Sequence, residues 1–158
     1  MTEHRPDAVT LRPARAADCA ALSKLAMVSK AYWGYDDAFM EMCREELTIT
    51  PTRIDRETMA VAEQDGRIVG FYAYAEQDGG VAEVMDVFVD PTFIGAGLGR
   101  QLFEHMCDSA RSAGLSRLEI YADPHARAFY ERMGAVLVGE AASVSIPGRM
   151  LPQLTLDL

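Results

Sequence analysis

The feature that most constrains the fold is a run of residues that passes from a strand through a glycine-rich turn into a helix. Residues 81–90 have the pattern of a strand, and Gly95, Gly97 and Gly99 stand at alternate positions before an amphipathic stretch with helical spacing. With so little side-chain bulk, the backbone of this turn can approach a ligand closely, and the first N–H groups of the helix stay free to hold an anion. The pattern therefore predicts a site for a phosphorylated ligand.

Hydrophobic periodicity divides the rest of the chain into short strands and helices. Two Gly-containing turns, at Asp65-Gly66 and at residues 78–80, predict hairpins, so the three central strands should be antiparallel neighbours. The strand, helix and strand around the glycine turn predict a parallel pair joined by a right-handed crossover. The expected elements are strands at 8–13, 58–63, 67–76, 81–90, 116–121, 136–140 and 150–157, and helices at 18–31, from Asp36-Asp37 to near Pro51, from the glycine turn to Gly114, and from Asp123-Pro124 to Gly134.

Length and composition favour one soluble α/β (α+β) domain over residues 1–158. A chain of this length with 49% apolar residues can form one core without metal or disulfide support. The three cysteines are far apart and lack the spacing of metal ligands, so we expect no metal site. The net charge of −9 disfavours nucleic acid as a partner. Neither a signal peptide nor an apolar run of roughly 18 residues is present, so we expect a cytoplasmic protein without a membrane partner.

The glycine turn differs from two familiar nucleotide-binding motifs. Arg100 stands where a dinucleotide fingerprint needs its third glycine, and the Gly-Lys-Ser/Thr run of a P-loop is absent. The turn instead resembles motif A of the GNAT superfamily of N-acetyltransferases, which reads Gln/Arg-x-x-Gly-x-Gly/Ala and wraps the pyrophosphate of acetyl-CoA. Gly97 and Gly99 match that motif, and Ile94 occupies the Gln/Arg position.

Two further segments carry the same resemblance. Residues 123–135 resemble GNAT motif B, Asn-x-x-Ala-x-x-Phe-Tyr-x-x-x-Gly-Phe, with Asp123 at the Asn position and Ala135 at the final Phe. Residues 11–14 with Asp18 resemble the first strand and helix start of the family. The resemblance implies a single GNAT domain with a mixed, mostly antiparallel sheet of six to seven strands. It also implies about four flanking helices and a splay between the fourth and fifth strands.

The resemblance implies acetyl-CoA as the cofactor and assigns residues to it. Backbone amides at the splayed end of the fourth strand are expected to meet the amide and thioester carbonyls of the cofactor and to stabilise an oxyanion. Asp123, which replaces an amide-bearing residue, is better explained as a helix cap. The assigned residues are Val87, Phe88 and Val89 on the strand, Gly95, Ala96, Gly97, Leu98, Gly99 and Arg100 around the pyrophosphate, and Asp123 and Ala126 near the second motif.

Catalytic roles follow from the same resemblance. Glu83 occupies the place where many GNAT members carry a general-base glutamate, whereas Asp86 lies three residues further on. Strand alternation predicts that these two carboxylates face opposite sides of the sheet, so at most one should face the acceptor pocket. Glu83 is the expected general base, and Asp86 is the alternative. Tyr130 stands at the Phe-Tyr position of motif B, where the family's hydroxyl protonates the departing thiolate. The alternative for Tyr130 is simple packing.

The acceptor site is expected between the first two helices, the fourth strand and the late hairpin loop. Trp33, Tyr35 and Glu41 combine aromatic faces with a carboxylate, which suits a cationic amine. Ser143 and Arg149 equally suit a carboxylate-bearing acceptor, and the sequence does not decide.

We therefore expect an enzyme that acetylates a primary amine of a small molecule or peptide. A non-catalytic acyl-CoA-binding module is the competing hypothesis, because Ile94 and Ala96 replace the polar residues usual in motif A. A longer acyl group, an oxygen acceptor and a homodimer also remain open at this point.

Overall fold

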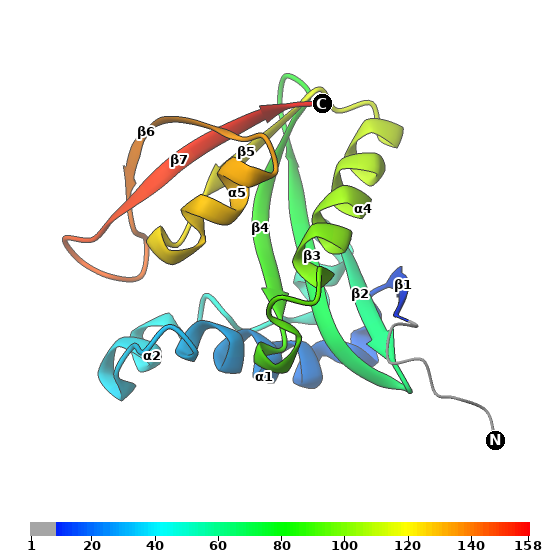
Figure 1. The fold of residues 1–158 in the computed structure, drawn as a ribbon, viewed down its shortest axis with the longest axis vertical. Coiled ribbons are helices and arrows are strands. Elements are labelled where there is room, and N and C mark those ends of the chain that lie inside the picture. Colours follow the sequence, from blue (N-terminus) through cyan, green and yellow to red (C-terminus); the bar gives the residue numbers. More distant parts are fainter. Residues whose placement is uncertain (1–8) are drawn as a thin grey trace.

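The computed structural model describes residues 9–158 as a seven-stranded sheet with helices on both faces (Figure 1). The strands are β1 (Thr10–Pro13), β2 (Thr58–Gln64), β3 (Arg67–Gln77), β4 (Val81–Val89), β5 (Arg117–Tyr121), β6 (Val136–Ala142) and β7 (Met150–Asp157). The helices are α1 (Cys19–Ala31), α2 (Asp37–Cys43), α3 (Pro51–Arg56), α4 (Leu98–Ser112) and α5 (Arg127–Arg132). Short 3-10 turns are η1 (Ala16–Asp18), η2 (Pro91–Phe93) and η3 (Pro124–Ala126). Residue 8 of the expected first strand lies outside the described residues.

The order of strands across the sheet is β1-β2-β3-β4-β5-β7-β6. The pair β4 and β5 is parallel, and the other neighbouring pairs are antiparallel. Both predicted hairpins are confirmed, with Asp65 and Gly66 in the left-handed region between β2 and β3, and Gly79 and Gly80 there between β3 and β4. The mixed, mostly antiparallel sheet is therefore as predicted.

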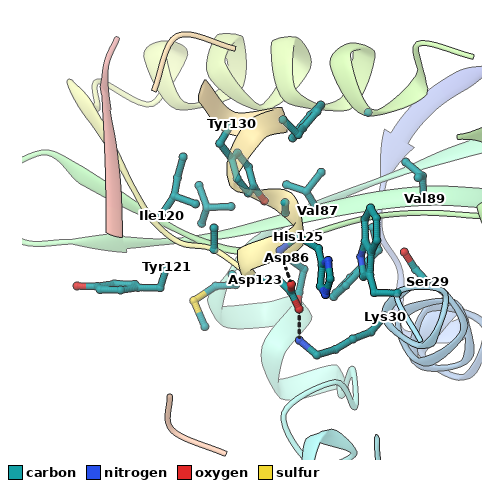
Figure 2. A pocket seen from close by; sticks show the side chains of 18 of the residues that line it. Ser29, Lys30, Asp86, Val87, Val89, Ile120, Tyr121, Asp123, His125 and Tyr130 are labelled. Atoms are coloured by element: carbon teal, nitrogen blue, oxygen red, sulfur yellow. Dashed lines mark hydrogen bonds and ion pairs between the residues drawn. The ribbon is translucent and has the colours of Figure 1, made fainter. Parts of the chain in front are cut away.

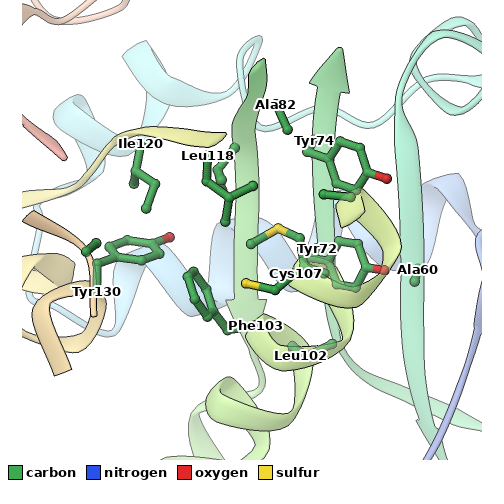
Figure 3. Packing of buried hydrophobic residues seen from close by; sticks show 14 of the residues in the cluster. Ala60, Tyr72, Tyr74, Ala82, Leu102, Phe103, Cys107, Leu118, Ile120 and Tyr130 are labelled. Carbon is green, nitrogen blue, oxygen red and sulfur yellow. The ribbon is translucent and has the colours of Figure 1, made fainter. Parts of the chain in front are cut away.

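The central strand β3 is buried on both faces, which explains its long apolar run. Tyr72 and Tyr74 point toward α4 and pack in one core cluster with Leu102 (Figure 3). Phe71 faces the other way and packs in a second cluster with residues of α1 and α2, such as Leu22. The sheet thus separates α4 and α5 on one side from α1 and α2 on the other.

One helix was not expected from the sequence. Pro51 begins α3 and does not end the preceding helix, which stops at Cys43. Thr50 is the N-cap, since its hydroxyl accepts a hydrogen bond from the Arg53 N–H at 3.2 Å, and proline suits the first helical position because that N–H has no intrahelical partner. The structure therefore has five α-helices among the described residues, where about four were expected.

Strand β4 contains a bulge that overturns one prediction. Its register against β3 pairs Val84 with Tyr74 and Asp86 with Ala73, which leaves Met85 as an extra residue. Glu83 pairs with Ala75, two residues from Ala73 and therefore on the same face of the sheet. Glu83 and Asp86 consequently lie on one face and not on opposite faces, because the extra residue Met85 shifts the alternation of side chains by one position.

The expected splay between the fourth and fifth strands is confirmed. The parallel pairing runs only from Val81 with Arg117 to Val84 with Ile120, whereas β4 continues to Val89. Beyond Ile120 the chain turns into η3 and α5, and Figure 1 shows this part diverging from β4. In the part of the chain that the structure describes, no helix has the length and apolar character needed to cross a membrane.

Candidate active site

A cavity of about 830 Å³ opens where β4 and β5 separate. Its wall combines the C-terminal half of β4, the glycine turn, η3 and α5 with the ends of α1, α3 and the loop between β6 and β7. Figure 2 shows Asp86, Val87, Asp123 and Tyr130 gathered around this space. The cavity therefore joins the two motifs that the sequence singled out.

The glycine turn has the backbone geometry that its residues predict. Gly95 and Gly97 adopt φ values of +85° and +83°, in the left-handed region where side chains are strained. Within the described residues, the N–H groups at positions 95 and 97–100 have no backbone acceptor, and Gln101 is the first to donate back, to the Gly97 carbonyl at 3.1 Å. Five free N–H groups at a helix N-terminus can hold an anion such as a diphosphate.

One member of the turn, Ala96, differs from the expectation. The Ala96 N–H donates to the Phe93 carbonyl at 3.1 Å, so this amide is already engaged, and Ala96 is not among the cavity-lining residues. Gly99 has a second role, because a Cβ there would stand 3.2 Å from the Phe129 ring of α5. Arg100 lies at the rim with an exposed side chain, 3.7 Å from Glu104.

The open edge of β4 offers two free amides, not three. The Asp90 N–H donates to the Val69 carbonyl of β3 at 2.8 Å. Because N–H groups alternate along a strand, the Phe88 N–H also points to β3, while those of Val87 and Val89 point to the side that β5 has left. The predicted donor role therefore fits Val87 and Val89, whereas Phe88 lines the cavity without a free amide.

Asp86 is the carboxylate of β4 that lines the cavity. It is 7% exposed, and its Oδ2 accepts a 2.5 Å hydrogen bond from Arg53, which also binds Glu57 at 2.7 and 2.8 Å. Burial raises the pKa of Asp86 to about 6, against the opposing effect of Arg53, and the charges of Glu57 and Glu46 add to the increase. Sequence reasoning missed Arg53 and Glu57 because it missed α3, although their i,i+4 spacing after Thr50-Pro51 was a usable signal.

Glu83 lies on the same face as Asp86 but is not among the residues that line the cavity. It accepts a 3.2 Å hydrogen bond from Gln77. Burial raises its pKa, with further increases from the charges of Glu119 and Glu57. Asp86 is therefore part of the cavity wall, whereas Glu83 lies outside it.

Tyr130 on α5 is 7% exposed and directs its hydroxyl into the cavity, as Figure 2 shows. That hydroxyl forms no hydrogen bond with the described residues, in contrast to Tyr74, whose hydroxyl lies 2.9 Å from Ser109 Oγ. Burial raises the pKa of Tyr130 above its usual value, as do the charges of Asp86 and Asp123. The hydroxyl has no protein partner and is not sealed from the cavity, so it is available to a ligand.

Asp123 is the centre of a cluster with Lys30, Tyr35 and Arg149, called the Asp123 cluster below. Its carboxylate caps η3 by accepting from the His125 N–H at 2.8 Å, as predicted, and it also accepts from the Tyr35 hydroxyl at 2.8 Å. Lys30 lies 3.2 Å and Arg149 3.3 Å from Oδ2. Burial raises the pKa of Asp123, but these donors and Lys30 hold it below its usual range.

The three predicted acceptor residues have different positions. Trp33 lines the cavity and stacks on His125, with ring centroids 5.1 Å apart and planes 3° from parallel. Tyr35 does not line the cavity, because its hydroxyl is bound within the Asp123 cluster. Glu41 is exposed on α2 and paired with Arg44 at 2.9 Å, outside the lining residues. Ala126 and Leu98 line the cavity on the cofactor side.

Comparison with known proteins decides the family. Residues 24–135 match the model of the Acetyltransferase (GNAT) family. The chain belongs to the GNAT acetyltransferase family. Its fold is shared at a TM-score of 0.79 and 15% identity with the PaiA N-acetyltransferase of Thermoplasma acidophilum in complex with coenzyme A, over 96% of this chain and 99% of that one.

Further relatives agree with this GNAT assignment. A GCN5-related N-acetyltransferase from Rhodopseudomonas palustris has a TM-score of 0.79 at 20% identity, over 99% of this chain and 100% of that one. An IAA acetyltransferase of Azospirillum brasilense is 42% identical over 73 residues, which are 41% of this chain and 48% of that protein. The chain thus spans about half the length of this curated relative.

Proposed function

We propose that this GNAT domain transfers the acetyl group of acetyl-CoA to a primary amine of a small molecule or peptide by direct attack. The observation that carries the proposal is the cavity at the splay, which connects five free N–H groups of the glycine turn with Asp86 and Tyr130. A phosphate-binding end and a proton-transfer end in one space are what such a reaction requires.

The residues present fit coenzyme A. The N–H groups at positions 95 and 97–100 suit its diphosphate, and the free amides of Val87 and Val89 suit carbonyl oxygens farther along the cavity. When bound, acetyl-CoA supplies the acetyl group as a thioester. The two amides of β4 are also placed to stabilise negative charge on the thioester oxygen.

Proton transfer is assigned to the polar side chains of the cavity. Asp86 accepts the proton that the acceptor ammonium must lose before its nitrogen forms the new C–N bond, and its pKa of about 6 keeps it ionised at neutral pH. Glu83, the base that family resemblance favours, is the second candidate, reached from the cavity through water. Tyr130 donates its hydroxyl proton to the sulfur as the C–S bond breaks and regains a proton from solvent.

The test is release of free thiol from acetyl-CoA by the purified protein with a panel of primary amines, paired with calorimetry of coenzyme A binding. Thiol release that depends on the amine, with the acetylated amine detected by mass spectrometry, supports the proposal. Coenzyme A binding without any turnover supports the non-catalytic module. Absence of both binding and turnover in folded protein contradicts both hypotheses.

A further inference from the structure

One wall of the cavity is rich in carboxylates. Four of them line it, from the turn after α2, from the residue that follows α3, and from β4. This set is called the acidic wall below and consists of Glu45, Glu46, Glu57 and Asp86. The charges of three of these groups act on one another, since those of Glu57 and Glu46 both raise the pKa of Asp86.

The acidic wall has more negative charge than its neighbours neutralise. Arg53 is the cation within it, and its guanidinium is divided between Glu57 and Asp86. Glu45 and Glu46 are exposed and have no ion pair among the described residues. Four carboxylates against one guanidinium give a formal net charge of −3, and two of the four, Glu45 and Glu46, have no ion pair among the described residues.

A second, independent observation shows that this region is built for a ligand. Tyr130 is 7% exposed, its hydroxyl lacks a hydrogen bond within the described chain, and it points into the same space as Asp86 (Figure 2). Asp86 uses only Oδ2 for Arg53, so its Oδ1 is left without a described donor. No sealed side-chain nitrogen or oxygen of the described residues lacks a partner, so both of these oxygens are open to the cavity, where a ligand can bind them.

The cations on the other side of the cavity are already occupied. Arg149 donates to the Tyr35 hydroxyl at 2.6 Å and lies 3.3 Å from Asp123, with its guanidinium 4.8 Å from the centre of the Phe39 ring. Lys30 is also bound to Asp123. An acceptor carboxylate would therefore find these two cations occupied, and it would be repelled by the acidic wall.

We propose that the acceptor is a dication, an alkyl diamine or a molecule with two ammonium groups, whose reacting nitrogen lies at Asp86 and Tyr130 while Glu45 and Glu46 hold the second ammonium. This inference rests on the proposed acetyl transfer and names its substrate class. It resolves the choice between a cationic and a carboxylate-bearing acceptor in favour of the cation, since the acidic wall has unpaired charge and Arg149 does not.

The experiment compares three acceptors of matched length on the intact protein: 1,4-diaminobutane, butylamine and 4-aminobutanoate. Each has four carbons, and they differ at the fourth, which carries an ammonium in the diamine, is a methyl in butylamine and is a carboxylate in aminobutanoate. We expect kcat/KM to fall about tenfold from diamine to monoamine, which corresponds to about 1.4 kcal/mol, and further for the amino acid. The advantage of the diamine should shrink with added potassium chloride, because salt screens partly exposed charges.

Variants connect this preference to the acidic wall. Glu46→Gln should raise KM for diaminobutane about tenfold and change KM for butylamine much less, because only the diamine has a second ammonium that loses its partner. Asp108→Asn is the matched control, since it removes the same charge from an exposed carboxylate of α4 that is paired with Arg111 outside the cavity. This control should leave KM unchanged for both diaminobutane and butylamine.

The outcomes separate this inference from the proposed function. Turnover with equal kcat/KM for diaminobutane and butylamine, or a preference for aminobutanoate, overturns the dication and leaves acetyl transfer standing. If no amine is acetylated, calorimetry of diaminobutane and butylamine in the presence of coenzyme A still decides. Tighter binding of the diamine that Glu46→Gln abolishes supports the inference, and equal or absent binding contradicts it.

Discussion

The two ends of the cavity are constructed in different ways. The phosphate-binding end is formed by backbone N–H groups from one short segment, residues 95–100, with Val87 and Val89 close before it. The acceptor end is formed by side chains from segments that are far apart in the sequence, with Arg53 of α3 reaching Asp86 of β4, and Arg149 reaching Asp123. One end depends on local backbone geometry, and the other depends on tertiary packing.

This difference explains how each end tolerates change. Motif A lacks its usual polar residue at Ile94, yet the free N–H groups of the turn are present, because no side chain supplies them. At the acceptor end, a single substitution alters a charge that several neighbours share. We therefore expect mutations to affect the cofactor end through backbone strain and the acceptor end through charge.

The largest expected effect is at the acceptor end. Asp86→Asn should lower kcat/KM by a factor on the order of 10² to 10⁴, the usual contribution of a general base. In the unmodified protein, the rate should rise as pH increases through about 6, because the Asp86 carboxylate must be ionised to accept a proton. That rise should be absent in the variant.

Glu83→Gln is the matched comparison for Asp86. It removes the neighbouring carboxylate of the same strand face, which lies outside the cavity lining. A loss confined to Glu83→Gln, with Asp86→Asn near normal, would show that family resemblance identifies the base better than the cavity does.

Tyr130 should give the next largest effect. Tyr130→Phe should lower kcat roughly 10²-fold through loss of the general acid, with little change in thermal stability because its hydroxyl has no protein partner to lose. Tyr74→Phe is the control, since it removes a buried hydrogen bond to Ser109 and should cost about 0.5–1.5 kcal/mol of stability while activity stays normal. Stopped-flow kinetics measures turnover of the two variants, and thermal unfolding measures their stability. A normal kcat for Tyr130→Phe, or a loss of kcat that matches a loss of stability, refutes the acid role.

The cofactor end should respond through the backbone. Gly97→Val places a branched side chain at φ +83°, a strain of about 1–2 kcal/mol, and should weaken coenzyme A binding roughly tenfold to thirtyfold by calorimetry. Gly114→Val imposes the same strain at φ +82° at the far end of α4, where a Cβ also has open space. The two variants should lose similar stability, and only Gly97→Val should lose affinity.

The smallest effect is expected at Glu41, outside both ends. Glu41→Gln removes an exposed charge on α2 that pairs with Arg44 and does not line the cavity, so steady-state kinetics with any amine should stay within about twofold. A larger change would restore Glu41 to the acceptor site that the sequence suggested.

The phosphate-binding end of the cavity could be predicted from the sequence better than the acceptor end, for physical reasons. The glycine turn could be predicted because left-handed glycines and a helix start are local properties of residues 95–100. The bulge at Met85 could not, because it becomes visible only in the register between β3 and β4. Without it, alternation placed Glu83 and Asp86 on opposite faces.

The acceptor end was also hard to predict because Pro51 begins a helix and does not end one. The sequence pattern predicts a helix that ends near Pro51, although Thr50 before it is a good N-cap and proline suits the first helical turn. With α3 missing, Arg53 and Glu57 could not be brought to Asp86. The Asp123 cluster was hidden for a similar reason, since Tyr35 and Arg149 are 114 residues apart in the chain and meet only in the folded protein.

The stacked pair of Trp33 and His125 gives this protein an internal optical reporter. The chain has a single tryptophan, and it lies on the cavity wall with its indole against an imidazole from η3. Any molecule that separates the two rings changes the surroundings of that one chromophore. The fluorescence of Trp33 can therefore report ligand binding in the cavity in real time, without a dye, a radiolabel or a coupled assay.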